Sequence, residues 1–314
     1  MVLSSAGLLA RTPLHAEESD AGRRRTGRSR HDVVVSVARS TTRGTVGMIT
    51  SGGRVLRVGV LDLPNLPAVT TGALSLRGGA PASEFAPLER GERILGLSAL
   101  PDGGPGIALA TRQGVVKRVA PEWPAKGEAV DVVALKPGDE VVGAVELVDG
   151  EEELVLFAST GDLLRFPASA VRPQGRSAGG MVGMKLAAGA FVVGFSAVSL
   201  APPEGMLDVV DEPVVVTGGG LPPEGRGRGP GVVSSVKVTP LSDYPRKGRA
   251  TGGVRCQRLL SGEALLVLGW AGRAPAWAAA GSGDPVELPM TYGKRDGSGT
   301  PVDKPPAAVG RPHR

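Results

Sequence analysis

The chain has 314 residues and a formal net charge of +5, with 36 basic and 31 acidic side chains. Its single cysteine, Cys256, excludes an intrachain disulfide, and its three histidines are far apart, so neither a zinc site nor histidine-based catalysis has support. No apolar run approaches the roughly 20 residues of a membrane span. The basic balance favours a polyanionic partner. The arginine excess has an alternative explanation, a GC-rich genome, so charge alone decides little.

Glycine and proline set the fold class. The 48 glycines and 27 prolines make up about a quarter of the chain, roughly twice the usual share. Long helices tolerate this composition badly, whereas many short strands joined by turns require it. Aromatic residues are few, so the core must be packed mainly from Val, Leu and Ala. The composition therefore predicts an all-β protein.

A β-hairpin pattern recurs along the chain. Each copy has an apolar run, a turn with a glycine, and a second apolar run that ends in a basic residue. The clear copies and their glycines are 2–11 (Gly7), 48–57 (Gly53), 108–118 (Gly114) and 154–172 (Gly161). The first copy matches this pattern better than it matches a signal peptide. Two less regular hairpins are predicted at 214–238 and at 265–277, the latter with Gly272 in its turn.

A second repeated phrase follows the hairpins: an apolar residue, a turn that ends in glycine, and an apolar strand. Its copies are LERGERILG (88–96), LKPGDEVVG (135–143), LAAGAFVVG (186–194) and LLSGEALLV (259–267). Self-similarity with a period of about 40–50 residues and four strands per unit is typical of a toroid of blades, and the hairpins predict six units.

The same pattern divides the chain. We expect one repeat domain over residues 1–288, with a flexible Arg-rich loop at 12–31 and a Gly/Arg-rich insertion at 220–231. After residue 288 the pattern stops, and residues 289–314 are predicted to be a disordered tail.

A third repeated element lies in the connections between hairpins and later strands. Residues 174–180 read QGRSAGG and residues 247–253 read KGRATGG, and a shorter relative, LRGGA, stands at 76–80. Arginine flanked by glycine lets the backbone approach a phosphate chain closely while the guanidinium group reaches out. A single copy would indicate only a glycine-rich turn with a solvated arginine. Recurrence at a fixed place in the unit favours phosphate binding.

Three phrases resemble a known family: ATRQGVVKR (110–118), FASTGDLLR (157–165) and VKVTPLSDYPRKGRATGG (236–253). They are similar to the C-terminal β-pinwheel domain of the bacterial type IIA topoisomerase A subunit, that of DNA gyrase or topoisomerase IV. The resemblance covers roughly residues 1–288. It implies a six-bladed β-pinwheel, a propeller-like toroid of four-stranded blades, whose basic outer rim binds duplex DNA and bends or wraps it.

The resemblance also implies which bases bind DNA. The hairpin-end bases that match the family's recurring Lys/Arg position are Arg11, Arg57, Lys117, Arg118, Arg165 and Lys237. The bases that match its connecting loops are Arg176, Lys247 and Arg249. We expect nearby bases to add to the same surface: Arg54, Arg77, Arg172, Lys185, Arg246 and Arg258. Such a rim would bind with strong salt dependence and little sequence preference.

No catalytic residue, metal site or cofactor site is expected in this chain. Tyr244 and Tyr292 do not stand in the context of the family's cleavage tyrosine, and the 220–231 loop lacks the Gly-Lys-Ser/Thr ending of a P-loop. By resemblance the domain serves an ATP-dependent type II topoisomerase, an isomerase, whose ATP and Mg²⁺ belong to the rest of the holoenzyme. The implied partners are duplex DNA, the N-terminal breakage–reunion part of the A subunit and the ATPase B subunit. The implied location is the cytoplasm, on the nucleoid, without a membrane.

Some features depart from the family pattern. Gyrase A subunits have a QRRGGRG-type box in the first blade, and QGRSAGG, KGRATGG and LRGGA are all degenerate versions of it. This favours a topoisomerase IV type, or a second enzyme of actinobacterial style, over true gyrase. The first hairpin begins almost at Met1, which suggests a C-terminal fragment of a longer A subunit. The alternative to DNA binding is a propeller-like protein-interaction scaffold, whose rim would be aromatic and mixed polar rather than basic.

Overall fold

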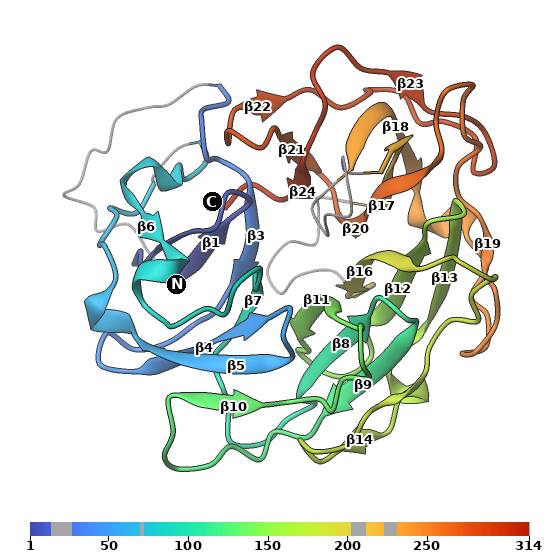
Figure 1. The fold of residues 1–314 in the computed structure, drawn as a ribbon. Helices are drawn as coiled ribbons and strands as arrows, with labels where there is room; N and C mark the ends of the chain where they lie inside the picture. The colour runs from blue at the N-terminus through green and yellow to red at the C-terminus, as the bar shows by residue number, and fades with distance from the viewer. Residues whose placement is uncertain (14–26, 70–71, 202–211, 223–230, 314) are drawn as a thin grey trace.

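The computed structural model describes residues 1–13, 27–69, 72–201, 212–222 and 231–313. Over these residues the chain forms six β-sheets of three to five strands, arranged as blades around a ring (Figure 1). The prediction of an all-β, six-bladed β-pinwheel is confirmed. Helix in the described ranges is limited to short 3-10 segments: η1 (Val60–Asp62), η2 (Leu76–Gly78), η3 (Ala82–Glu84), η4 (Ala168–Ala170) and η5 (Leu241–Asp243). None of them is long and apolar enough to cross a membrane.

Each blade is built on an antiparallel hairpin. The hairpins are β1 (Val2–Ser4) with β2 (Leu8–Ala10), β4 (Thr45–Thr50) with β5 (Arg54–Gly59), β8 (Ile107–Thr111) with β9 (Val115–Val119), β12 (Glu153–Ala158) with β13 (Asp162–Pro167), β17 (Pro213–Leu221) with β18 (Val232–Pro240), and β21 (Trp277–Ala279) with β22 (Pro285–Val286). The turn glycines take left-handed backbone angles, for example φ +77° at Gly53 and +84° at Gly161. Only glycine adopts this conformation without strain, which explains the recurring glycine in the hairpin pattern.

The inner edge of each blade is a single strand, and these strands surround the centre of the ring (Figure 1). They are β3 (Val34–Val37), β7 (Ile94–Ser98), β11 (Val141–Glu146), β16 (Val192–Val198), β20 (Leu265–Arg273) and β24 (Ala308–Gly310). Each one packs against the inner strand of the next blade, and β24 packs against β3, so the ring is closed. The predicted hairpin at 265–277 is wrong, because residues 265–273 are the one continuous strand β20 and the sixth hairpin follows at β21 and β22.

Glycines allow the inner strands to approach each other closely. A Cβ on Gly96 of β7 would lie 2.6 Å from the carbonyl oxygen of Ala144 in β11, and one on Gly143 would lie 2.9 Å from Cβ of Phe195 in β16. A Cβ on Gly194 of β16 would overlap the carbonyl oxygen of Gly269 in β20. In the three copies of the second repeated phrase that end in glycine, this glycine is therefore an inter-blade packing residue.

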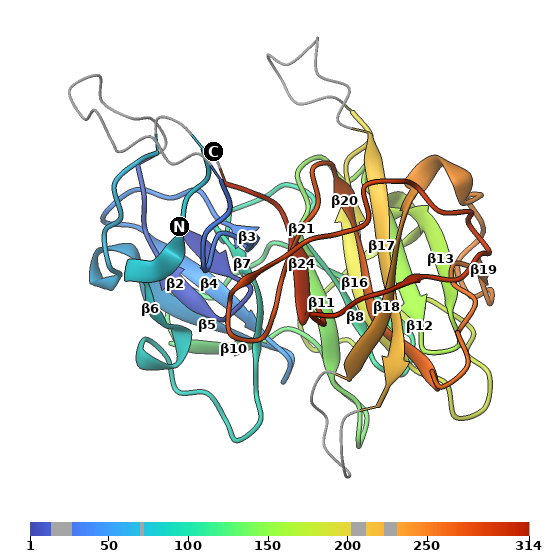
Figure 2. The same cartoon turned by 90° about the horizontal axis from the view of Figure 1, so that it is seen from above.

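The outer edge of a blade comes from later in the chain. The outer strands are β6 (Ala80–Pro81), β10 (Ala129–Asp131), β14 (Pro173–Gln174) with β15 (Met181–Val182), β19 (Val254–Arg255) and β23 (Thr300–Pro301). β10, for example, follows the β8–β9 hairpin of the third blade but pairs with β5 of the second. Each of these strands thus returns to a blade after the next hairpin has been made, and consecutive blades are interlocked (Figures 1 and 2).

The C-terminal region closes the ring. Val34 and Arg311 exchange two backbone hydrogen bonds of 3.0 and 2.9 Å, and β23 and β24 complete the fifth and sixth blades. The prediction of a disordered tail at 289–314 is wrong for residues 289–313. The strands β23 and β24 have only two and three residues and little apolar pattern. They could not be predicted from the sequence, because they are defined by pairing with distant strands.

The described end of the 12–31 segment lies on the sixth blade. Arg28 donates hydrogen bonds to the carbonyl of Ala278 (2.7 Å) and to both carboxylate oxygens of Asp32, and its guanidinium group lies 4.4 Å from the ring centre of Trp277. The backbone N–H of His31 donates to Gly283. The expectation of a flexible loop is therefore wrong for residues 28–31, while the other arginines of the stretch, 23–25, lie outside the described residues. The same holds for most of the 220–231 insertion.

Candidate nucleic-acid interface

The outer edge of the ring presents a basic loop in five blades. In each, a loop with at least one Lys or Arg precedes or adjoins the outer strand, and Figure 1 shows these strands around the periphery. The bases and strands are Arg77 at β6, Lys126 at β10, Arg172 and Arg176 at β14, Lys247 and Arg249 at β19, and Lys294 and Arg295 at β23. We call this set of loops the outer-edge loops. The glycines in them keep the backbone slender, so that the basic side chains are the main projecting groups.

In three blades, the segment that follows the outer strand donates a backbone hydrogen bond to the outer-edge loop of the next blade. Ala134 donates to Ala178 (3.3 Å), Lys185 donates to Thr251 (3.0 Å), and Arg258 donates to Gly297 (3.0 Å). The exposed side chains of Lys185 and Arg258 therefore stand beside the loop of the following blade. This arrangement explains why Lys185 and Arg258 follow the two Gly-Arg phrases at the same spacing.

The predicted DNA-binding residues fall into groups with different exposure. The side chains open to solvent are Arg77, Arg172, Lys185, Arg246, Lys247 and Arg258. Arg246 forms an ion pair with the buried carboxylate of Glu153. Arg176 and Arg249 are half-buried, and Arg249 donates to the carbonyl of Val182 (2.6 Å). The outer edge thus brings together bases from five blades that are distant in sequence.

The hairpin-end arginines bind the protein's own backbone. Their acceptors are Leu63 O for Arg11 (3.2 Å), Pro124 O (2.5 Å) and Gly127 O (3.2 Å) for Arg57, Pro105 O for Arg118 (2.6 Å), and Leu241 O for Arg165 (3.2 Å). All four are half-buried, and burial lowers the pKa of Arg165. Arg54 pairs with Glu92 and Glu89, and the hydrogen bond to Glu92 raises the pKa of Arg54. Direct DNA contact by these side chains stays a prediction.

The two hairpin lysines are buried. The exposed fractions of Lys117 and Lys237 are 1% and 3%. The ammonium group of Lys117 donates to the carbonyls of Val132 (2.8 Å), Arg176 (2.7 Å) and Ala178 (2.6 Å). The prediction that Lys117 and Lys237 contact phosphate directly is therefore wrong for this structure. A buried ammonium group that already donates to three backbone carbonyls has no access to a phosphate.

Lys237 makes the same arrangement in the fifth blade. Its ammonium group donates to the carbonyls of Lys294 (2.9 Å), Arg295 (2.7 Å) and Gly297 (2.9 Å). Burial lowers the pKa of Lys117 and of Lys237 to about 8. Both ammonium groups consequently hold an outer-edge loop from beneath.

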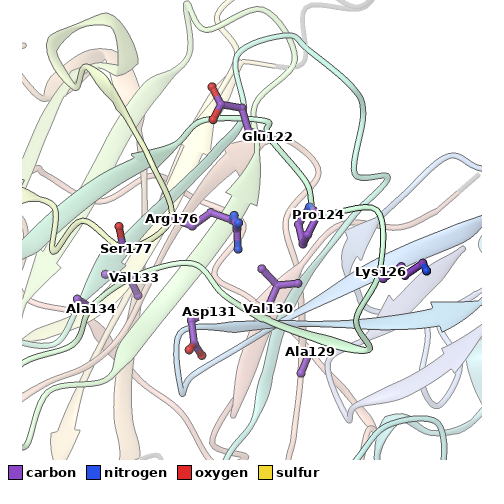
Figure 3. A pocket seen from close by; sticks show the side chains of 10 residues that line it. All are labelled: Glu122, Pro124, Lys126, Ala129, Val130, Asp131, Val133, Ala134, Arg176 and Ser177. Atoms are coloured by element: carbon purple, nitrogen blue, oxygen red, sulfur yellow. The ribbon is translucent and has the colours of Figure 1, made fainter.

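A cavity of about 660 Å³ lies at the outer edge between the second and third blades (Figure 3). Its lining includes Arg176 and Lys126, which come from different segments, and the acidic residues Glu122 and Asp131. Because bases and acids line it in equal number, its charge does not select an anion.

Sequence reasoning missed three bases of the outer-edge loops: Lys126, Lys294 and Arg295. The segment 294–299, KRDGSG, resembles KGRATGG in composition and occupies the same place before an outer strand. The expectation that the repeat stopped at residue 288 hid this signal. Lys126 stands in KGEA, which lacks the second glycine of the other copies.

Two side chains with nucleophilic character, Tyr244 and Cys256, are buried in the described part of the chain. Tyr244 is fully buried, shares a hydrogen bond with Thr239 (2.8 Å), and has its pKa raised by burial. Burial also raises the pKa of the Cys256 thiol to about 12. Within the described ranges no cluster of three or more His, Cys, Asp or Glu side chains could hold a metal ion. The chemistry that this edge supports is binding of a polyanion.

Comparison with known proteins gives consistent results. The family model described as the DNA gyrase C-terminal domain, a β-propeller, matches residues 152–199 and 235–267. The gyrase A subunit of Escherichia coli is 30% identical over 278 residues, which are 85% of this chain and 28% of that protein. The gyrase A subunit of Salmonella typhimurium is 32% identical over 219 residues, which are 68% of this chain and 21% of that protein. The chain thus spans about a quarter of the length of these relatives.

Solved structures share the fold. The C-terminal domain of a DNA topoisomerase IV superposes with a TM-score of 0.69 at 20% identity, covering 98% of this chain and 91% of that one. A DNA gyrase A C-terminal domain superposes with a TM-score of 0.62 at 17% identity, covering 98% of this chain and 97% of that one. At these identities the likeness shows the fold alone.

Proposed function

Because the chain belongs to the family of C-terminal β-propeller domains of DNA gyrase A and topoisomerase IV, we propose that its outer edge binds and bends duplex DNA. The observation that supports this most is the recurrence of basic, glycine-containing loops at the outer strands of five blades. Bases spaced around a curved edge neutralise successive phosphates, release counterions, and favour a duplex bent along the same curve.

In this role the domain acts with the rest of a type IIA topoisomerase. Its partners are the breakage–reunion part of the A subunit, which contains the cleavage tyrosine, and the ATPase B subunit. The domain itself supplies no chemical step. It holds a DNA segment near the enzyme for strand passage, and it is thereby associated with the nucleoid in the cytoplasm.

The binding proposal is tested by measuring the affinity for a fluorescent duplex of about 40 base pairs over a range of salt concentrations. A phosphate-driven interface gives a straight line on a log–log plot. A triple variant, Arg77→Ala/Arg172→Ala/Lys247→Ala, removes exposed bases from three blades. We expect roughly tenfold weaker binding and a salt slope smaller by roughly 3, since each lost phosphate contact lowers the slope by about 1.

The matched control exchanges Arg90→Ala, an exposed arginine in the turn after the first blade's outer strand rather than in an outer-edge loop. It should bind like the unmodified protein. Absence of DNA binding at low salt would contradict the proposal and favour a protein-interaction scaffold.

Ligation of a nicked plasmid with bound protein then separates wrapping from bending. A linking-number change of fixed sign means that the domain wraps DNA, and no change means that it only bends DNA.

A further inference from the structure

We propose that Lys117 and Lys237 are positioning residues that shape the DNA-binding outer-edge loops from within, each by binding three loop or flanking carbonyls through one ammonium group. This inference rests on the proposed DNA-binding function. It assigns these lysines a role that neither a phosphate contact nor simple core packing provides.

The first support is geometric. An ammonium group has three N–H donors, and both lysines use all three on backbone carbonyls at 2.6–2.9 Å. The acceptors of Lys117 come from two segments: Val132, just after the outer strand β10 of the second blade, and Arg176 and Ala178 in the loop of the third blade. Lys117 therefore ties two adjacent blades together at the point where the outer edge is continuous.

The second support is that the acceptors belong to the basic residues themselves. Lys117 binds the carbonyl of Arg176, and Lys237 binds the carbonyls of Lys294 and Arg295. A fixed carbonyl fixes the adjacent Cα, and hence the direction in which the basic side chain leaves the backbone. Buried carbonyls that lose a partner are costly, so the loops would rearrange if the ammonium groups were absent.

The third support is that the two sites match although their blades differ. Lys117 stands in a five-residue strand after a tight Gly114 turn, whereas Lys237 stands in a nine-residue strand after a long connection. In the second blade the position of Lys117 is taken by apolar Leu56, and there Arg57 binds the loop carbonyls of Pro124 and Gly127. The outer-edge loops are thus held by a hairpin cation in more than one way.

Protonation gives the inference a specific readout. Burial lowers the pKa of both lysines to about 8, so the ammonium form predominates at pH 7 and is lost as pH rises through about 8. A neutral amine has two N–H donors for three carbonyls, and the loops lose one bond each. DNA affinity should therefore fall between pH 7 and pH 9, whereas exposed lysines and arginines stay charged over this range.

The charged neighbours of the two lysines do not obscure this readout. Around Lys117 the surrounding segments contain Asp131, Arg118 and Arg176. Around Lys237 they contain Asp296, Arg295 and the Cys256 thiol, whose pKa is raised to about 12. Carboxylates and guanidinium groups as classes titrate well outside the range from pH 7 to pH 9. The raised pKa keeps the Cys256 thiol neutral over the same range.

The experiment compares the full chain with Lys117→Met, Lys237→Met and the double variant. Affinity for duplex DNA is measured at pH 7 and pH 9 at constant ionic strength, and amide hydrogen exchange is measured separately at pH 7. We expect the double variant to bind about tenfold more weakly at pH 7 and to show no further loss at pH 9. Exchange should speed up in residues 174–180 and 294–299, and remain unchanged in β12 and β13.

Lys247→Met, an exposed lysine of an outer-edge loop, is the matched control. It should weaken binding slightly, retain the pH step of the unmodified protein and leave loop exchange unaltered.

Lysine variants that bind as tightly as the unmodified protein, with protected loops, would overturn the inference. If the variants do not fold, the unmodified protein decides by itself, since an affinity that is flat from pH 7 to pH 9 contradicts it. If the unmodified protein binds no DNA at all, the proposed function fails, while loop exchange still tests whether the lysines hold the loops.

Discussion

The inner and outer edges of the blades are built from different chemistry. The inner strands have up to nine residues, and glycines such as Gly194 let them pack backbone against backbone. The outer strands have two or three residues and are accompanied by basic loops. The inner edge consequently determines whether the ring exists, and the outer edge determines what the ring can bind. Substitutions at the two edges should therefore separate stability from DNA binding.

The largest loss of stability is expected at the contact between Arg28 and the sixth blade. Arg28→Ala removes the cation that binds Asp32, a carboxylate only 1% exposed, together with the bond to Ala278. Leaving a buried carboxylate without its partner should lower the free energy of unfolding by about 3 kcal/mol, measured by urea denaturation. Arg30→Ala, an exposed neighbour, is the control and should change it by less than about 1 kcal/mol. Equal losses of stability in the two variants would contradict a stabilising role of Arg28 at this contact.

A smaller loss is expected at the inner edge itself. Gly194→Ala adds a Cβ that overlaps the carbonyl oxygen of Gly269 in the next blade, so the two strands must move apart. Overpacking of this kind should cost about 2 kcal/mol in the same denaturation experiment. Gly175→Ala, where a Cβ would meet nothing within 4 Å, should be close to neutral. The DNA affinity of the folded Gly194→Ala protein should remain unchanged. A clear loss of affinity would contradict the conclusion that the inner edge affects stability and the outer edge affects binding.

The smallest effect is expected for a hairpin-end arginine between the two edges. Arg118→Met removes a hydrogen bond to the carbonyl of Pro105 but keeps much of the apolar stem. We expect the free energy of unfolding to fall by about 1 kcal/mol. The DNA affinity, measured at one fixed salt concentration, should change by less than about twofold. A tenfold loss of affinity would instead return Arg118 to the DNA-contacting surface that the family resemblance implies.

Much of the inner edge could be predicted from the sequence. The positive-φ glycines, such as Gly53 and Gly91, and the apolar strands beside them follow local rules, so the repeated phrases located five of the hairpins and gave the number of blades. The sixth hairpin was misplaced, because residues 265–273 form one continuous strand. The outer edge could be predicted only in part. Gly-Arg phrases identified the loops of the third and fourth blades, whereas the loop at Lys294 was hidden because its strand, Thr300–Pro301, has no pattern of its own.

The sequence by itself determined the fold class, the repeat and the family, because turn glycines and alternating apolar runs act through neighbours in the chain. Tertiary structure alone decided which bases are available to a partner. Lys117 and Lys126 are both basic and nine residues apart, yet the first is buried under three carbonyls and the second is exposed. Exposure depends on the strand that returns from the next blade to cover a hairpin, and no local pattern contains that information.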